Sequence, residues 1–460
     1  MSDMDVFFNP QSIAIIGASE SYKFGYWTTK YLLNSKFKTY PVNITKDTIF
    51  NQKAYKSIKE IPFDIELAII LVGNDKVLDA VIECIDKQVK GIIIESAGFA
   101  ETGIDRFISI QKKIETLAIQ SKVRIIGPNC VGIVNFENHF SSTEIDFDED
   151  DTDYGNISII AQSGVLGNIF IDWAISQKIK LSKAITLGNK VDVDEIDMIK
   201  YLNNDPTTKV LTVYLEGVKR GRELITTLKS ASKPILILKN GKSQMGSKAI
   251  ISHTGSIAGD NKIYDALFKQ CPTTFPVNNF YEMFNIAQVF STQPLPKGQN
   301  LAIITSSGSL GILACDLMDK YGLELANLKQ STIENMRSVS PNWTSVKNPV
   351  DLGPSLFTTF KPALKSLLSD ENVDALLFIF AVPRKPLEAF NLSMAPQLKI
   401  VYKLIEQYQK PVIICVFGSR WVFDFFLKHT LRYQIPVMRQ LEHAIKAFKL
   451  THKYYDSSTK

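Results

Sequence analysis

The chain has 460 residues, more than a single hydrophobic core usually serves, so we expect two to four domains. Hydrophobic residues make up 45% of the sequence and charged residues 22%, which is typical of a soluble globular protein. A net charge of +5 on a chain of this length is too small to indicate a nucleic-acid partner, although it does not oppose the binding of anionic nucleotides.

The sequence also argues against a membrane-spanning, secreted, zinc-binding or disulfide-bonded protein. No apolar run approaches the ~18 residues needed to span a membrane, and the first ten residues lack the apolar centre of a signal peptide. The five cysteines are scattered and form no CxxC pair, so neither a zinc site nor a disulfide framework is indicated. We therefore expect a cytoplasmic protein that does not contact membranes, because free thiols suit a reducing compartment.

The N-terminal third alternates short apolar runs with helical patterns. Residues 12–16 form an apolar run that ends in Gly17-Ala18-Ser19, as the first βα unit of a nucleotide-binding domain does. The alternation predicts a parallel, doubly wound sheet in a domain at residues 1–145. An acidic run at residues 146–153 then reads as a solvated linker. The remaining predicted strands of this domain are residues 38–42, 66–72, 91–95 and 124–126.

Two further βα series follow, so the predicted fold class is α/β with three successive doubly wound domains. The second domain is expected at residues 154–290 and the third at 299–455, with a proline- and glycine-bearing linker at 292–298 between them. The predicted strands are residues 156–161, 183–187, 210–216 and 234–239 in the second domain and 300–305, 375–382, 411–417 and 436–439 in the third.

Three βα turns, at residues 17–19, 162–164 and 306–308, are rich in glycine and serine. Each would direct free backbone amides at an anion. Gly241-Lys242-Ser243 could end a P-loop for ATP, but that motif needs a glycine five residues before Gly241. The sequence has Leu236 there, so a P-loop is rejected.

A nicotinamide dinucleotide is also disfavoured in the first domain. The G-x-G-x-x-G fingerprint has Ser19 and Tyr22 at its second and third glycine positions, and the second strand is followed by Asn43 rather than by an acid. A ligand with a phosphorylated ribose, such as coenzyme A, would avoid an acid there.

Residues 252–260 place one histidine, His253, among small polar residues ahead of a helical pattern. Backbone amides freed by glycines and by the start of a helix suit a phosphate. An imidazole with an ordinary pKa of about 6.5 is mostly neutral at cytoplasmic pH and can accept a phosphoryl group. On these residues alone, His253 is either a phosphoryl carrier or, as a histidine in such a loop more often is, an ordinary surface residue.

These turns and the histidine loop carry a resemblance that covers nearly the whole chain. The chain resembles the α subunit of ADP-forming (NDP-forming) acyl-CoA synthetases, relatives of succinyl-CoA synthetase. The motifs are residues 16–19, 41–43, 96–101, 127–132, 161–164, 187–195, 215–217, 252–256 and 348–352.

The resemblance implies a Rossmann-like CoA-binding domain followed by two flavodoxin-like ligase domains. It implies a phosphohistidine at His253 that is oriented by Glu216. The phosphate group would be held by Ser163, Gly164, Gly255 and Ser256. Coenzyme A would be bound by Gly17, Ala18, Ser19, Gly25, Asn43, Val72, Ser96, Gly98, Phe99 and Asn129.

The implied reaction is that of an ADP-forming acid–CoA ligase. Acyl-CoA, ADP and phosphate would be converted reversibly into a carboxylic acid, CoA and ATP through an acyl phosphate, with acetate as the first candidate among several acids. A separate β subunit with an ATP-grasp fold would bind ADP or ATP with Mg²⁺, in an α2β2 assembly. No metal site is expected in this chain.

Several of these residues also have a plainer interpretation. Cys130 is expected to pack rather than to react, and Asn129 to shape the turn after Pro128. Glu216 could instead pair with Lys219 or Arg220.

Two further motifs leave their roles open. Asp192, Asp194 and Glu195 could serve in charge pairing, which makes Gly188 and Asn189 the better site candidates. The turn at residues 306–311 has less glycine than in many relatives and lacks their proline, which puts a phosphate role for that turn in doubt.

Two competing functions remain at this level. A CoA-binding regulatory protein of the same fold would not turn over, and intact His253 and Glu216 argue against it. A nicotinamide-dependent oxidoreductase is disfavoured by the fingerprint positions given above.

Overall fold

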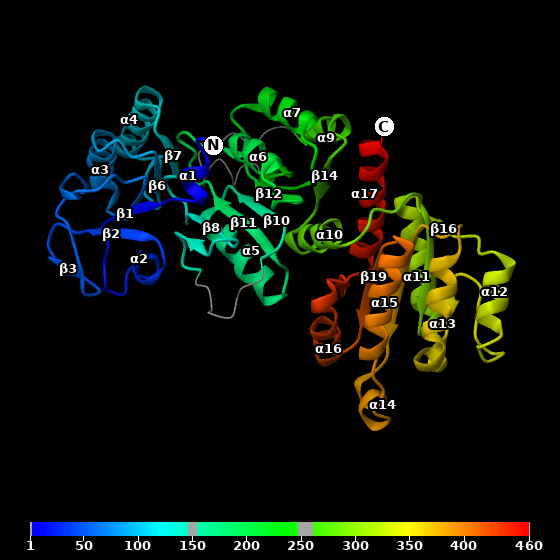
Figure 1. Ribbon diagram of the computed structural model, residues 1–460. Coiled ribbons are helices and arrows are strands. Elements are labelled where there is room, and N and C mark those ends of the chain that lie inside the picture. Colours follow the sequence, from blue (N-terminus) through cyan, green and yellow to red (C-terminus); the bar gives the residue numbers. More distant parts are fainter. Residues whose placement is uncertain (1, 146–153, 247–260, 460) are drawn as a thin grey trace. The chain divides into compact units, whose positions relative to one another are not determined.

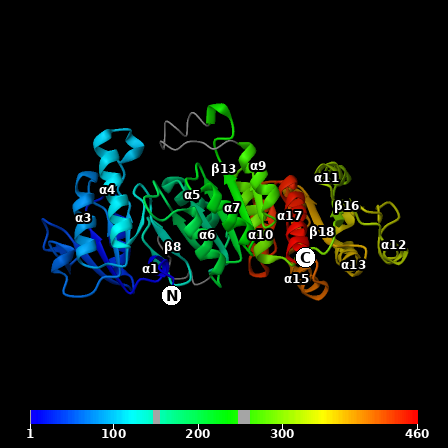
Figure 2. The same ribbon diagram turned by 90° about the horizontal axis from the view of Figure 1, so that it is seen from above.

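A computed structural model describes residues 2–145, 154–246 and 261–459. The chain divides into two compact units, Met1–Phe280 and Tyr281–Lys460, which are described separately (Figures 1 and 2). Within the described ranges, no helix is long and apolar enough to cross a membrane. The predicted acidic linker at 146–153 lies outside the described residues.

The first sheet of unit 1 is parallel, with the strand order β2-β1-β5-β6-β7. A parallel bridge between Val42 and Tyr55 adds a rudimentary outer strand beyond β2, which gives the order of a Rossmann sheet. The strands are β1 (Ser12–Ile16), β2 (Lys38–Val42), β5 (Leu67–Ile70), β6 (Gly91–Ile94) and β7 (Arg124–Ile126). The helices are α2 (Tyr26–Asn34), α3 (Asn74–Asp86) and α4 (Asp105–Ser121), and a small hairpin joins β3 (Thr48–Ile49) to β4 (Gln52–Lys53).

The second sheet has the order β14-β13-β12-β10-β11-β8-β9, and its five parallel strands follow the flavodoxin-like 2-1-3-4-5 pattern. The parallel strands are β10 (Ile157–Ala161), β11 (Leu181–Thr186), β12 (Val210–Leu215), β13 (Ile235–Lys239) and β14 (Thr274–Val277). The helices are α5 (Gly164–Ser176), α6 (Glu195–Asn204), α7 (Gly221–Ser230) and α9 (Asn261–Gln270). Strand β14 was not predicted, because it is short and contains Pro276; it lies at the edge of the sheet, where proline is tolerated.

Two short strands depart from the predicted domain boundary. Strands β8 (Ile133–Asn135) and β9 (Phe140–Ser141) fall within the domain expected at residues 1–145, yet β8 pairs antiparallel with β11 of the second sheet. Ile133 opposite Ile185 is fully buried, so apolar burial holds this segment on the second sheet. Such brief strands carry too little periodicity to reveal their partner.

The two sheets of unit 1 share one apolar core. Ile13, Ile69 and Ile93 of the first sheet belong to the same buried cluster as Ile185 and Val213 of the second. The first and second sheets are therefore held together by continuous packing, and side chains from both can contribute to one site.

Unit 2 contains the third sheet, with the order β16-β15-β18-β19-β20 and β17 beside β15. All its pairings are parallel, in the flavodoxin-like order. The strands are β15 (Asn300–Thr305), β16 (Glu324–Leu325), β17 (Val350–Asp351), β18 (Ala375–Ala381), β19 (Val412–Phe417) and β20 (Val437–Met438). The helices are α10 (Phe280–Thr292), α11 (Gly308–Tyr321), α12 (Gln330–Arg337), α13 (Leu356–Ser369), α14 (Arg384–Ala389), α15 (Ala395–Tyr408), α16 (Arg420–Thr430) and α17 (Leu441–Thr459). The predicted α/β class with parallel sheets is confirmed.

The division between the units falls between Phe280 and Tyr281, ahead of the proline- and glycine-bearing linker predicted at 292–298. Almost all of helix α10 therefore belongs to unit 2. The second domain predicted from the sequence ends at residue 290 and so includes most of this helix; its bounds stay a prediction.

The short helix α1 (Asp5–Phe8) fills a seam in unit 1. Phe7 and Phe8 are fully buried, and the Phe8 ring stacks on Tyr201 of α6 with 5.1 Å between centroids. The side-chain amides of Asn135 and Asn138 both donate to the Phe8 carbonyl oxygen. The N-terminal segment thus links the region of β8 to α6.

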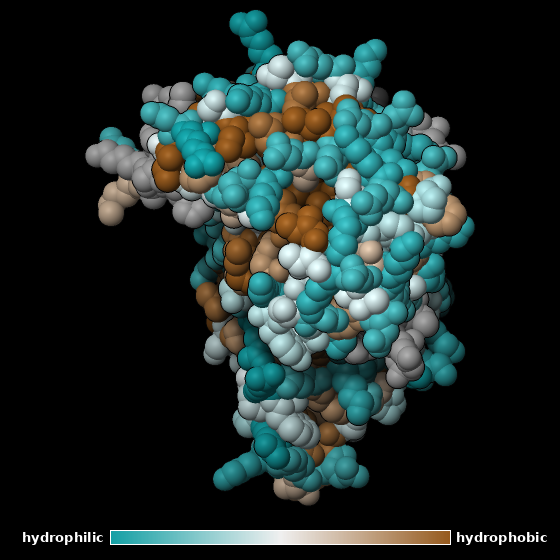
Figure 3. Space-filling model, turned by 90° about the vertical axis from the view of Figure 1, so that its left-hand side faces the viewer, coloured by the Kyte–Doolittle hydropathy of each residue, from teal (hydrophilic) through white to brown (hydrophobic). Residues whose placement is uncertain are grey.

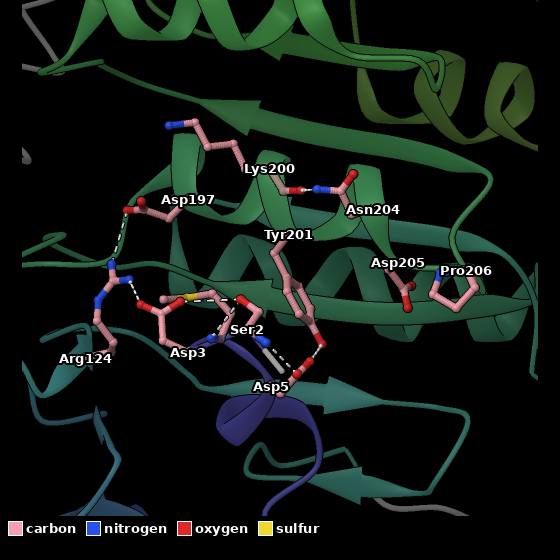
Figure 4. A pocket seen from close by; sticks show the side chains of 11 residues that line it. Ser2, Asp3, Asp5, Arg124, Asp197, Lys200, Tyr201, Asn204, Asp205 and Pro206 are labelled. Atoms are coloured by element: carbon pink, nitrogen blue, oxygen red, sulfur yellow. Dashed lines mark hydrogen bonds and ion pairs between the residues drawn. The ribbon is translucent and has the colours of Figure 1, made fainter.

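A cavity of about 370 Å³ adjoins this segment, between residues 2–5, Arg124 and α6 (Figure 4). Its charged groups are already paired: Arg124 binds Asp3 and Asp197, and the Tyr201 hydroxyl donates to Asp5 over 3.0 Å. Arg124 opens β7, so the cavity lies at the amino end of that strand, away from the strand ends where ligands bind in such sheets. We therefore interpret this cavity as a gap between packed segments and not as a ligand site.

Candidate functional site

The second sheet places two predicted site segments side by side. Strands β10 and β12 are neighbours at the point where the strand order reverses, and in such sheets ligands bind beyond the carboxyl ends of the strands at that point. Ser163 and Gly164 follow β10 and begin α5, while Glu216 follows β12. The amides at the start of α5 are therefore close to the Glu216 turn, in an arrangement that suits a phosphate.

Gln162 joins these segments. Its side chain, 5% exposed, accepts hydrogen bonds through Oε1 from the backbone N–H groups of Glu216 (2.9 Å) and Gly217 (3.1 Å). Its own carbonyl oxygen accepts from the N–H of Gly188, 3.1 Å away. Through its side chain and its backbone carbonyl, Gln162 thus connects the turns that follow β10, β11 and β12.

Two buried lysines hold the carbonyl groups of the same turn. Lys239 Nζ donates to the Glu216 oxygen over 2.8 Å, and Lys190 Nζ donates to the Gly217 oxygen over 2.8 Å. Lys190 also pairs with Glu195, which is fully buried. Burial lowers the pKa of Lys239 to about 8, against the opposing charge of Glu216, so its ammonium group is mostly charged at pH 7.

The Glu216 side chain is held by a residue of the strand that ends just before it, β12. The Tyr214 hydroxyl donates to Glu216 Oε1 over 3.1 Å, and Asn240 Nδ2 donates to the Tyr214 oxygen over 2.8 Å. The alternative partners considered for Glu216 bind elsewhere: Arg220 pairs with Asp194, and Lys219 donates to the carbonyl oxygen of residue 190. The carboxylate of Glu216 is therefore not neutralised by either of these cations.

The predicted CoA residues all lie at the carboxyl edge of the first sheet. They are Gly17, Ala18 and Ser19 after β1, Gly25 before α2, Asn43 after β2, Val72 after β5, Ser96, Gly98 and Phe99 after β6, and Asn129 after β7. The side chains of Phe99 and Ala18 are fully buried in the core, so a contact of these two residues with CoA would involve their backbone atoms. Asn43 donates to the Ala18 oxygen over 2.9 Å, so its amide shapes the first turn.

The carboxyl edge of the first sheet, where the predicted CoA residues lie, is called the CoA edge below. Hydrogen bonds connect it to the second sheet. Glu101 accepts from the N–H of Gly98 (2.6 Å) through Oε1 and from the Asn189 amide (2.6 Å) through Oε2. The Asn129 amide in turn donates to Asn189 Oδ1 over 3.3 Å. A Cβ atom at Gly188 would lie 2.2 Å from the Pro128 oxygen, so only glycine permits this approach.

The same loop reaches the start of α5. A Cβ atom at Gly164 would lie 2.9 Å from the Val131 side chain. The loop at 127–132 therefore spans the distance from the CoA edge to the predicted phosphate turn. Asn129 has a left-handed φ of 61°, which bears out its role in shaping the turn.

The acids of the motif at 187–195 serve in charge pairing. Asp192 binds Arg124, Asp194 binds Arg220, and Glu195 binds Lys190. This supports Gly188 and Asn189 as the members of the motif that lie nearest to the site.

His253, Gly255 and Ser256 lie outside the described residues. The chain leaves the second sheet after Lys239, at the carboxyl end of β13 next to β12, and is described again from α9 onward. Residues 240–246, which follow β13, are still described.

The third predicted phosphate turn differs from the second. A Cβ atom at Gly308, which begins α11, would lie 2.8 Å from Asp351 Oδ2. A carboxylate therefore already faces the N-terminus of this helix and competes with a phosphate for its amides. This finding strengthens the doubt about a phosphate role for residues 306–311.

Two buried titratable groups lie behind the CoA edge. Cys130 is 2% exposed, and burial raises the pKa of its thiol, which supports the packing interpretation. Glu95 is 3% exposed, and its Oε1 has no hydrogen-bond partner among the described residues. Burial, and to a lesser degree the charge of Glu144, raises the pKa of the Glu95 carboxyl well above its usual range.

Glu95→Gln is therefore expected to make stability less dependent on pH. In the wild type the unfolded state loses its proton above about pH 4.3 while the folded state keeps it, so the free energy of unfolding falls as pH rises toward the folded pKa. Glutamine removes this loss, and the melting temperature of the variant should exceed that of the wild type by more at pH 8 than at pH 5. Thermal unfolding across this range measures the effect, with Glu60→Gln, an exposed change in the same unit, as the control. A difference that does not vary with pH contradicts the prediction.

The surface of the first sheet's side is mainly hydrophilic. Figure 3 shows teal side chains over most of that face, with small separate hydrophobic patches. Exposed aromatic residues of this part include Tyr22, Phe24 and Trp27, in the turn and first helical residues after β1.

The chain matches two protein-family models and is similar to several known proteins. Residues 11–135 match the model of the CoA binding domain family, and residues 154–290 match that of the succinyl-CoA ligase-like flavodoxin domain. The α subunit of ADP-forming acetate–CoA ligase II from Pyrococcus furiosus is 44% identical over 83% of this chain and 83% of that protein. The corresponding subunit of ligase I from the same organism is 33% identical over 98% of this chain and 97% of that protein.

Solved structures agree with these matches. The acetyl-coenzyme A synthetase 1 of Ca. Korarchaeum cryptofilum, solved with phosphate and ADP, superposes with a TM-score of 0.89 at 28% identity, covering 100% of this chain and 98% of that chain. PH0766 from Pyrococcus horikoshii gives a TM-score of 0.87 at 35% identity, covering 99% of this chain and 100% of that chain.

A CoA-binding sheet packed on a succinyl-CoA ligase-like sheet defines the class of acid–CoA ligases related to succinyl-CoA synthetase. Within that class, the chain belongs to the family of ADP-forming acetate–CoA ligase α subunits.

Proposed function

We propose that this chain is the α subunit of an ADP-forming acid–CoA ligase, with acetate as the first candidate acid. It would interconvert acyl-CoA, ADP and phosphate with carboxylic acid, CoA and ATP. The observation that carries the proposal is the position of Glu216 beside the Ser163–Gly164 turn, connected through Asn189 to the CoA edge.

The chemistry is assigned to four groups of residues. The first sheet binds CoA through the turns after its strands, so that the thioester approaches the loop at 127–132. Phosphate, held by the amides of Ser163 and Gly164 together with Gly255 and Ser256, attacks the thioester carbonyl, and the CoA thiolate leaves. His253 then takes the phosphoryl group from the acyl phosphate, which releases the acid, while Glu216 fixes the imidazole tautomer.

The phosphohistidine must then meet a nucleotide. From the family resemblance we assign ADP or ATP with Mg²⁺ to a partner subunit with an ATP-grasp fold, in an α2β2 assembly. The α-subunit names of the relatives support a partner, and the Archaeoglobus fulgidus relative, of which this chain covers 67%, supports fusion of the two in some proteins. We also propose functional domains at residues 1–145, 154–290 and 299–455, with the first two forming the site.

The experiment combines the chain with its partner subunit, Mg²⁺ and ATP labelled in the γ-phosphate. The chain should acquire acid-labile, base-stable phosphate, and acetate with CoA should discharge it with formation of acetyl-CoA. Failure to acquire label from an active partner overturns the proposal. Thermal-shift titrations with CoA and with NADH test the first sheet separately, and stabilisation by NADH alone would favour the oxidoreductase alternative.

A further inference from the structure

The backbone of the Glu216–Gly217 turn is held at all four of its polar groups. Both N–H groups donate to Gln162 Oε1, and the two carbonyl oxygens accept from Lys239 and Lys190. All three side chains are at most 6% exposed. The Cα of Glu216 is therefore fixed, and the remaining freedom is in its side chain.

That side chain is restrained by Tyr214, which lies two residues earlier, just before β12 ends at Leu215. Tyr214 is 4% exposed, and its ring packs edge-on against Phe170 with 5.9 Å between centroids. Asn240 donates to the hydroxyl oxygen, so the hydroxyl proton is directed at Glu216 Oε1. Burial and the charge of Glu216 raise the pKa of Tyr214, which keeps it a neutral donor.

The two carboxylate oxygens of Glu216 are thereby made unequal. Oε1 accepts from Tyr214, whereas no described residue binds Oε2. A carboxylate held in this way presents one oxygen, in one direction, to a further donor. The ring N–H of a histidine is such a donor, and binding it leaves the other nitrogen as the nucleophile.

We propose that Tyr214, itself held by Asn240, is a positioning residue that fixes Glu216 for the phosphorylation of the histidine. This inference rests on the proposed function, since it acts through the proposed orientation of His253 by Glu216. It assigns no contact between Tyr214 and the substrates. Its expected effect is therefore on the rate of phosphoryl transfer and on its pH dependence.

The test compares the wild type with Tyr214→Phe, using the full chain with its partner subunit, Mg²⁺ and γ-labelled ATP. The variant preserves the ring and its packing but removes the hydroxyl. The single-turnover rate of label incorporation should fall about 10- to 100-fold, as for other residues that orient a reacting side chain. The acid limb of the pH–rate profile should move to higher pH, because the carboxylate loses a donor to its charged form.

Two further variants separate positioning from general stability. Tyr201→Phe removes another hydroxyl that donates to a carboxylate, that of Asp5. Tyr201 lies on helix α6 and does not bind Glu216, so the rate and profile of this variant should match the wild type. Asn240→Ala should shift the profile in the same direction as Tyr214→Phe, and the double variant should lose little more than Tyr214→Phe alone.

The outcomes are distinguishable. If the wild type acquires label while Tyr214→Phe retains its rate and profile, the positioning role is wrong and the proposed function stands. A lower melting temperature with an unchanged acid limb also overturns it, because that result shows structure alone. If the wild type acquires no label, the proposed function fails and this inference fails with it.

Discussion

His253→Ala is expected to abolish phosphate incorporation into the chain. Alanine has no group that can accept a phosphoryl group, so neither labelled ATP nor acyl phosphate should leave label on the variant. Formation of ATP from acetyl-CoA, ADP and phosphate should fall to background, because the proposed route passes through this residue in both directions. Electrophoresis under neutral conditions after incubation with labelled ATP, followed by acid treatment, measures the first effect, and coupled ATP detection measures the second.

The matched control is His429→Ala, which removes another of the five histidines, from helix α16 of unit 2. It should keep both the label and the overall activity. Label that persists in His253→Ala would place the phosphoryl group on another residue. Mapping the labelled peptide would then identify it.

Glu216→Gln is expected to lower the rate of incorporation by about 10²- to 10⁴-fold, the range lost when a group that assists or orients a reacting histidine is changed. Glutamine keeps the shape of the side chain, and its oxygen can still accept from the Tyr214 hydroxyl. Its amide nitrogen is a donor, however, so it cannot accept the ring N–H and favours the wrong tautomer. The loss should appear in kcat, with a smaller change in the KM for CoA, because the CoA edge is formed by other residues.

Glu223→Gln provides the control for this substitution. Glu223 lies in the first turn of α7 and pairs with Lys200 and Arg220 at the surface of the same unit. Its variant should be indistinguishable from the wild type in rate. A Glu216→Gln rate within about twofold of the wild type would remove Glu216 from the mechanism.

The central strands of all three sheets could be predicted from the sequence for a physical reason. Parallel strands covered on both faces are continuously apolar, and each ends at a turn of small residues. The run at 12–16 before Gly17-Ala18-Ser19 is an example, and β1 has these bounds. The strands β8, β9 and β14 could not be predicted this way, because they have two to four residues and β14 also contains a proline.

The residues of the candidate site could likewise be predicted only in part. Glu216 and Ser163 stand at predicted strand ends, so their meeting follows from the topology. Gln162, Lys190 and Lys239 were not singled out, because a glutamine in a turn and lysines near strand ends are usually solvated. Tyr214 did carry a signal, since it lies two residues before Glu216 on the same face of the predicted strand.

Phe99 shows what a resemblance leaves open. The resemblance implies that Phe99 contributes to the CoA site, and its side chain is fully buried in the structure. Motif membership indicates that a residue is needed, but burial decides whether it serves the ligand or the core.

The packing of helix α1 has a consequence for biosynthesis. Phe8 is made roughly 190 residues before Tyr201, the ring on which it stacks, a delay of about 10–40 s at ordinary translation rates. Asn135 and Asn138, which bind the Phe8 carbonyl, also appear long after it. Phe8 therefore waits without these partners while the first sheet is already complete. Slow translation between residues 140 and 200 should lengthen the interval in which this segment can be captured by a chaperone or pair wrongly.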